Sequence, residues 1–209
     1  MSSPIVKFAR CALASGLFVF TAAQAGAVET IAREAVMIDV QTGAVLFKKS
    51  SDTPMPPASM SKLMTVYMVF ERLRDGRLSL DDNFSVSENA WRKGGTKSGS
   101  STMFLEPGKR VRVEDLLRGI IVQSGNDACI VVAEALSGSE EAFAVEMTEK
   151  ARQIGLMNST FTNATGWPDE NHLMTAMDLA VLAKKIIEDF PEYYHYYSEK
   201  SFVYNGIKQ

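Results

Sequence analysis

The segment Ser59–Lys62, which follows a proline-rich approach, constrains this 209-residue chain more than any other feature. Apolar residues then recur at helical spacing until Gly76, a pattern that predicts a helix. Ser59 and Lys62 are therefore expected about one turn apart on one helix face. A serine nucleophile needs a proton acceptor within hydrogen-bond reach, and a lysine in a water-poor pocket has a lowered pKa and can be that acceptor. Free backbone N–H groups at the helix start would also suit an oxyanion.

A second polar motif, Ser124–Asn126, interrupts two apolar segments of helical periodicity at 113–122 and 129–136. A break between helices is a place where polar side chains can face a cleft. Each motif alone has an ordinary interpretation, because a serine–lysine pair is common on helix surfaces and the second motif resembles a helix-linking turn. The two motifs in this order, on an exported chain, favour a serine acyl-enzyme.

The rest of the chain predicts strands at both ends and helices between them. Alternating apolar residues and a glycine turn predict an N-terminal hairpin. Thr175 and Asp178 form a capping-box-like helix start. The expected elements are a hairpin over 35–49, helices over 59–76, 113–122, 129–136, 139–154 and 175–190, turn-rich segments over 77–112 and 158–174, and a strand over 202–204.

The N-terminal residues 1–27 have the pattern of a secretory signal peptide. Lys7 and Arg10 precede an apolar run over 11–23, and small residues at A-x-A spacing follow it. The run is too short for a hydrocarbon core, which needs about 20 residues. The sequence therefore predicts cleavage, export and no transmembrane helix in the mature chain.

Composition excludes several other classes of protein. The chain is 46% hydrophobic and 22% charged, which is ordinary for a globular domain, and its net charge of −3 gives no sign of nucleic-acid binding. Removal of the signal peptide leaves Cys129 as the only cysteine, so no internal disulfide is expected. His172 and His195 lack the spacing of a zinc site. No metal or cofactor is predicted.

Four segments resemble the low-molecular-mass penicillin-binding proteins, which are serine-type D-Ala-D-Ala carboxypeptidases of the β-lactamase/transpeptidase-like superfamily. The similarity covers about residues 30–209. The segments are Pro57–Thr65, Met103–Gly108, Leu117–Ala128 and Tyr204–Ile207.

This resemblance implies an α/β (α+β) fold with a sheet built from both chain ends, an inserted helical region, and the active site between them. It gives Ser59 the role of acylated nucleophile and Lys62 that of its base. Ser124 would relay a proton to the departing D-alanine, and Asn126 would hold the substrate amide. The implied substrates are peptidoglycan stem peptides ending in D-Ala-D-Ala, the implied inhibitors are β-lactams, and the implied location is the periplasm.

The family's third motif, K-T-G on a later strand, does not occur after Ser124–Asn126. Residues 28–209 are accordingly expected to be the N-terminal and helical portion of a DD-peptidase catalytic domain, without its C-terminal strands. Such a portion would at best be a feeble enzyme alone. Lys97–Gly99 spells K-S-G, but it precedes the second motif and lies in a Gly/Ser-rich loop over 94–101, so we interpret it as a chance match.

Three alternatives stay open at this point. A class A β-lactamase would share the nucleophile and base, and Glu170–Met174 imitates its E-x-x-L-N motif but ends in methionine. A truncated, non-catalytic member of the same family is a second possibility. The third is a triad in which His172 serves Ser59 or Ser124, although Lys62 already provides a base.

Overall fold

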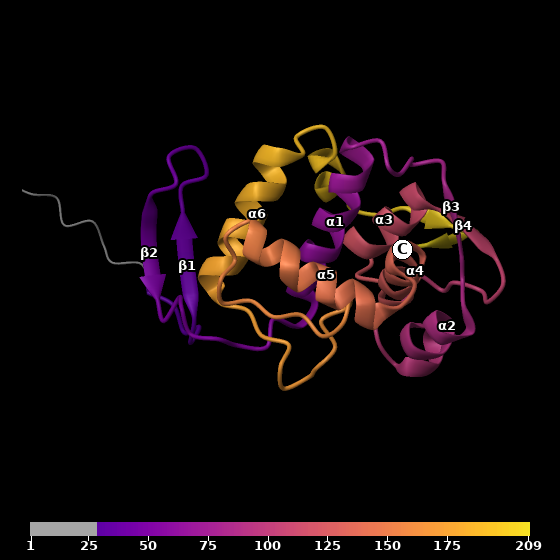
Figure 1. Cartoon of the computed structure of the whole chain (residues 1–209), viewed down its shortest axis with the longest axis horizontal. Coiled ribbons are helices and arrows are strands. Elements are labelled where there is room, and N and C mark those ends of the chain that lie inside the picture. The colour runs from indigo at the N-terminus through magenta and orange to yellow at the C-terminus, as the bar shows by residue number, and fades with distance from the viewer. Residues whose placement is uncertain (1–28) are drawn as a thin grey trace, which may run out of the picture. The chain divides into compact units, whose positions relative to one another are not determined.

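Helix α1 (Lys62–Arg74) runs through the middle of residues 29–209, the part of the chain that the computed structural model describes (Figure 1). It packs against α3, α4, α5 and α6. Every residue from Met64 to Phe70 is buried. The sequence predicts one apolar stripe on this helix, but residues 64–70 are enclosed on all sides, because other helices pack around them.

The other predicted helices are present, and a short 3₁₀ helix and one further α-helix lie within 77–112. That helix, α2, is short and is capped by the Ser87 side chain, which accepts a hydrogen bond from Ala90 N (2.9 Å). Thr175 caps α6 as predicted and accepts from Asp178 N (3.0 Å). The helices are η1 (Ala58–Ser61), α2 (Glu88–Gly94), η2 (Thr96–Ser98), α3 (Val113–Ile121), α4 (Asn126–Ser137), α5 (Glu140–Gln153), α6 (Ala176–Asp189) and η3 (Tyr194–Ser198).

The strands form three separate antiparallel pairs within residues 29–209. They are β1 (Ala35–Ile38) with β2 (Val45–Lys49), β3 (Asn83–Ser85) with β4 (Arg110–Arg112), and β5 (Val203–Tyr204) with β6 (Ile207–Lys208). The α/β class is confirmed, and the predicted strand near the C-terminal end is present. It folds back on β6 through Asn205 and Gly206, both at positive φ, so the strands from the two ends do not share a sheet in the described part.

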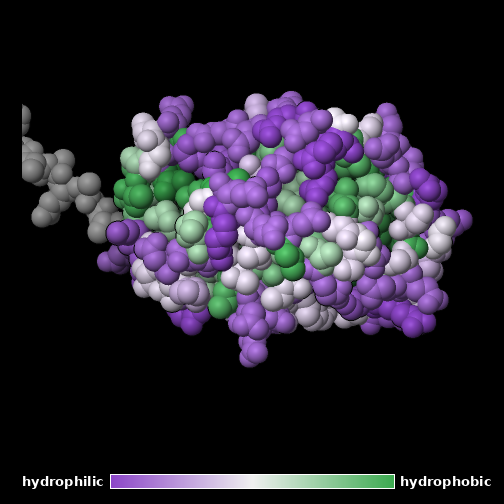
Figure 2. Space-filling view, viewed as in Figure 1, coloured by the Kyte–Doolittle hydropathy of each residue, from purple (hydrophilic) through white to green (hydrophobic). Residues whose placement is uncertain are grey.

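The N-terminal hairpin packs one side on α6 and leaves apolar side chains on its surface. Leu46 is 62% exposed, and Met37 and Val45 are about half exposed. Figure 2 shows the corresponding hydrophobic area over β1 and β2. Within residues 29–209, no helix combines the length and the apolar character needed to cross a membrane. The predicted signal peptide at 1–27 lies outside the described residues.

Helices α2 and α4 approach so closely that Gly94 has no room for a side chain. A Cβ at Gly94 would lie 2.3 Å from the backbone nitrogen of Asp127, whereas one at Gly119 would meet the flexible Met103 side chain. We expect Gly94→Ala to lower the free energy of unfolding by about 1–3 kcal/mol, because backbone cannot yield as a side chain can. Urea denaturation of Gly94→Ala and of the control Gly119→Ala checks this. Equal losses in both would contradict the prediction.

Candidate active site

Ser59 and Lys62 lie in hydrogen-bond contact, as their spacing predicts. Ser59 belongs to η1 and Lys62 begins α1, and Lys62 Nζ donates to Ser59 Oγ at 3.0 Å. Ser59 is exposed, whereas Lys62 is only 5% exposed. Burial lowers the pKa of the Lys62 ammonium. The pair therefore has the geometry of a nucleophile and a base, and the lowered pKa favours the uncharged amine that a base requires.

Ser124 joins this pair in a cavity of about 340 Å³ that is also lined by Ile120 and Tyr197. Ser124, which lines this cavity, has positive φ (58°), and so does Ala58 (49°), which directly precedes the nucleophile. Such conformations cost about 1–3 kcal/mol in non-glycine residues and persist only where surrounding contacts hold them. The strained positions are thus Ser124 itself and the residue directly before Ser59.

Asn126 faces a different cavity from the serine pair. It is the first residue of α4, is 7% exposed, and lines a neighbouring cavity of about 430 Å³. Its backbone N–H donates to Ser101 O (2.9 Å), and its Oδ1 is buried without a hydrogen-bond partner within residues 29–209. A buried amide oxygen is costly to leave unpaired, so this atom is a point of unmet hydrogen bonding beside the cavity.

Asp127 anchors the segment beside the second motif, a role that the sequence did not reveal. Its fully buried carboxylate accepts hydrogen bonds from Thr102 Oγ1 (2.7 Å), Met103 N (2.8 Å) and Leu105 N (3.0 Å). The aspartate directly after Asn126 was the only available signal, and it carries no role without the fold. The residue fixes 102–105 against the turn that holds Ser124.

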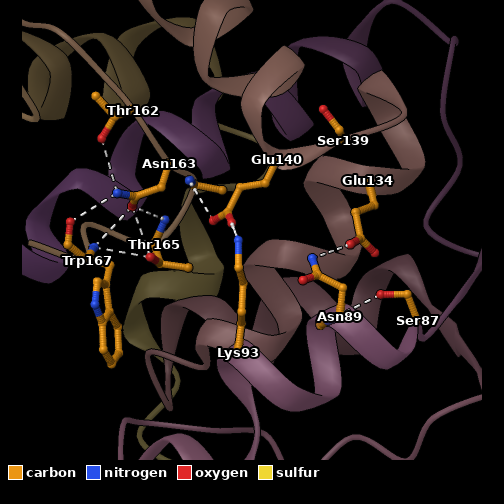
Figure 3. A network of polar contacts seen from close by, with 12 residues as sticks. Ser87, Asn89, Lys93, Glu134, Ser139, Glu140, Thr162, Asn163, Thr165 and Trp167 are labelled. Carbon is orange, nitrogen blue, oxygen red and sulfur yellow. Dashed lines mark hydrogen bonds and ion pairs between the residues drawn. The ribbon is translucent and has the colours of Figure 1, made fainter. Parts of the chain in front are cut away.

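The segment 163–167 is folded around the Asn163 side chain and presses on the nucleophile turn. Asn163 Oδ1 accepts from Gly166 N (2.8 Å) and Trp167 N (3.0 Å), as Figure 3 shows for the Trp167 contact. Gly166 has φ 80°, and a Cβ there would lie 1.9 Å from Ala58 O. Glycine is needed here because of the positive φ and because a side chain would collide with Ala58 O. The segment thereby supports Ala58, the strained residue before Ser59.

His172 contacts the first motif at Ser61 and not at either candidate nucleophile. Its Nδ1 accepts from Thr162 N (3.2 Å), so its Nε2 carries the proton and donates to Ser61 Oγ at 2.8 Å. Burial lowers the pKa of the imidazole. The geometry favours a neutral residue that ties the loop over 158–174 to the start of α1, and it gives the triad alternative no support.

Three other residues singled out in the sequence lie away from the serine pair. Lys97 of the K-S-G match is in η2, not on a strand, and its ammonium lies 4.9 Å from the centre of the Trp91 ring. Glu170 is exposed and does not line the Ser59 cavity. His195 is an exposed residue beside Tyr196. In residues 29–209 no cluster of His, Cys, Asp and Glu could hold a metal ion.

Tyr197, in the aromatic run over 193–197, is a cavity residue that no sequence motif singles out. It lines the cavity of Ser59 and Ser124, and its hydroxyl is buried without a hydrogen-bond partner in the described part of the chain. Its neighbour Tyr193 does pack in the core, where it stacks on Phe70 at 5.2 Å. A run of aromatic residues in the sequence gives no signal to separate these two positions.

Comparisons with known proteins place the chain in one family. The family model for D-alanyl-D-alanine carboxypeptidases matches residues 19–209. The chain is 40% identical to D-alanyl-D-alanine carboxypeptidase DacC of Escherichia coli (strain K12) over 200 residues, which are 92% of this chain and 50% of that protein.

Solved structures agree with the family match. Penicillin binding protein 5 from Haemophilus influenzae superposes with a TM-score of 0.83 at 39% identity, over 88% of this chain and 53% of that one. Penicillin-binding protein D2 from Listeria monocytogenes, in an ampicillin-bound form, has a TM-score of 0.69 at 28% identity, over 87% of this chain and 72% of that one. The chain belongs to the D-alanyl-D-alanine carboxypeptidase family, and it spans about half the length of the curated relatives it matches.

The Asp127 carboxylate is expected to be a main support of the site's backbone. In Asp127→Asn an N–H₂ group replaces one oxygen that accepts hydrogen bonds, so at least one buried donor loses its partner. The free energy of unfolding should fall by about 1.5–3 kcal/mol. Asp81→Asn is the control, because Asp81 is 84% exposed in its ion pair with Arg112 and should cost at most about 1 kcal/mol. Urea denaturation in which both variants lose the same small amount would contradict this role.

The buried His172 should make stability depend on pH. Its folded pKa lies below its ordinary value of 6.5, so the unfolded chain binds the proton first as the pH falls. The advantage of wild type over His172→Gln should be constant well above that pH. It should shrink as the pH falls through 6.5 towards the folded pKa, by at most about 1.4 kcal/mol per pH unit. Urea denaturation of both proteins between pH 7.5 and 5 measures this difference, and an advantage that grows on acidification would show that the charged imidazole is the stabilised form.

Proposed function

We propose that this protein is a serine-type D-Ala-D-Ala carboxypeptidase that removes the terminal D-alanine from peptidoglycan pentapeptides. The observation that carries the proposal is the 3.0 Å contact between the buried Lys62 Nζ and Ser59 Oγ. Membership of the D-alanyl-D-alanine carboxypeptidase family supports the substrate class, as does the likeness to D-alanyl-D-alanine carboxypeptidase DacC of Escherichia coli.

In the proposed reaction, uncharged Lys62 accepts the proton of Ser59 while Oγ attacks the carbonyl carbon of the last peptide bond. Donors at the start of the helix stabilise the oxyanion, an effect that is worth several kcal/mol in such sites. The protonated Lys62 then returns the proton through Ser124, which shares the cavity, to the departing D-alanine amine as its bond to the carbonyl carbon breaks. Asn126 holds the substrate amide, and water then hydrolyses the acyl-enzyme and frees Ser59.

β-Lactams are the proposed inhibitors, because they acylate the same hydroxyl. The structural likeness to an ampicillin-bound penicillin-binding protein supports this. The β-lactamase alternative is not favoured by the family match, and Glu170 is exposed instead of lining the Ser59 cavity, where it would position a deacylating water.

Export to the periplasm is part of the same proposal. The support is the sequence pattern of residues 1–27, in which Lys7 and Arg10 precede an apolar run and small residues. Peptidoglycan lies outside the inner membrane, so a carboxypeptidase acting on it must cross that membrane. Residues 28–209 would then be the mature portion of a catalytic domain.

The nucleophile and base assignments are tested by covalent labelling with fluorescent penicillin. Ser59→Ala should abolish labelling, and Lys62→Ala should slow it by about 10² to 10⁴-fold, because it removes the general base. Lys97→Ala is the matched control, since Lys97 contacts Trp91 and should label at the wild-type rate. Labelling of Ser59→Ala at the wild-type rate would overturn the assignment.

The reaction itself is tested by D-alanine release from diacetyl-Lys-D-Ala-D-Ala. We expect release by wild type and none above background by Ser59→Ala, because the acyl-enzyme cannot form without the nucleophile. Rapid penicillin turnover without peptide cleavage would instead favour the β-lactamase alternative.

A further inference from the structure

Glu140 is a buried carboxylate at a place where acidic residues normally face water. It is the first residue of α5, directly after the helix cap at Ser139, and glutamates in a first helical turn stabilise the helix while exposed. Glu140 is nevertheless only 6% exposed, and burial raises the pKa of its carboxyl. Burying a carboxylate is costly without specific partners, so the partners of this one are informative.

The two carboxylate oxygens of Glu140 join two elements that are far apart in sequence. Oε1 accepts a hydrogen bond from Ala164 N at 3.2 Å, and Oε2 lies 3.5 Å from Lys93 Nζ on α2. Figure 3 shows Lys93 extending from α2 towards Glu140 beside the segment that carries Asn163. An ion pair with a 55% exposed lysine would by itself contribute little to stability. The distinctive feature of this ion pair is that its carboxylate also binds the loop residue Ala164.

Ala164 belongs to the segment 163–167, which supports the nucleophile turn. The carbonyl oxygen of Ala164 accepts a hydrogen bond from Thr65 Oγ1 (2.7 Å). Thr65 lies on α1, less than one turn from Lys62. Two residues after Ala164, Gly166 is packed against Ala58 O. The Glu140 carboxylate thus links α2 and α5, through the segment 163–167, to both sides of the serine–lysine pair.

The same connection forms a wall of the cavity that holds Asn126. Lys93, Glu140, Thr165 and Trp167 all line this cavity, and the unpaired Asn126 Oδ1 belongs to it. A shift of segment 163–167 would therefore change both the support of Ser59 and the space beside Asn126. In sites of this kind a displacement of about 1 Å can cost about 10²-fold in rate.

We propose that Glu140, held by Lys93, is a positioning residue that fixes segment 163–167 against the nucleophile turn and sets the width of the Asn126 cavity. It acts through Ala164 and does not touch the reacting atoms. The inference rests on the proposed function for its effect on acylation, and on the contacts alone for its effect on the segment.

The first test measures the segment itself by hydrogen–deuterium exchange of the backbone amides. In Glu140→Ala the Ala164 amide loses its acceptor and should exchange about tenfold faster, together with Gly166 and Trp167. Glu140→Gln keeps an acceptor oxygen and should restore protection to within about threefold of wild type. Lys93→Met, which alters a half-exposed side chain, should give an intermediate increase even if Glu140→Ala does not fold.

Glu134→Ala is the matched control, because Glu134 also links α2 to another helix by accepting from Asn89 Nδ2 (2.8 Å). It should leave exchange at 163–167 unchanged. Wild-type exchange at Ala164 in both Glu140→Ala and Lys93→Met would overturn the connection.

The second test measures the consequence for chemistry with fluorescent penicillin and the diacetyl tripeptide. Glu140→Ala should slow acylation by about tenfold relative to Glu134→Ala and raise KM, and Glu140→Gln should recover most of the rate. Faster amide exchange at 163–167 together with an unchanged acylation rate and an unchanged KM would overturn the positioning role. Failure of wild type to label at all would instead reject the proposed function, while the exchange data would still decide the connection.

Discussion

The contact between Lys62 and Ser59 depends on the burial of α1, and much of the fold serves that burial. Four helices pack against α1, which leaves the Lys62 side chain only 5% exposed at its first residue. Removal of water disfavours the ammonium, so the enclosure that stabilises the core also lowers the pKa of the candidate base. Stability and basicity therefore have one structural cause, and loosening α1 would weaken both.

Local strain at the site is held by contacts from distant segments. Ala58 and Ser124 both have positive φ, a conformation that each would leave in a free chain. Gly166 packs on Ala58 O, and Asp127, three residues after Ser124, binds the backbone of 102–105. These contacts come from the loop before α6 and from the start of α4, so the backbone of the site depends on segments outside its own two motifs.

The sequence predicts features that depend on nearby residues and misses those that depend on distant ones. The Ser59–Lys62 contact follows from helical spacing, and the Thr175 cap follows from local pattern. The roles of Asp127 and Glu140 could not be predicted, because each depends on a backbone N–H more than twenty residues away. The small helix α2 was not predicted, for the same reason. Its seven residues do not make a helix by themselves, and its apolar side is buried only because α2 packs on α4.

The division of the site into two cavities gives the Ser124–Asn126 turn a specific part in the proposed reaction. Ser124 lines the cavity of the nucleophile, while Asn126, two residues on, lines the neighbouring one. Gly125 between them is hemmed in, because a Cβ there would lie 3.0 Å from Asp127 Oδ1 and 3.1 Å from Met103 N. A peptide with its scissile carbonyl at Ser59 and a preceding amide at Asn126 must cross this turn. The turn would therefore fix the distance between the reacting carbonyl and the recognised amide, and Asp127, which binds the segment beneath it, would keep that distance constant.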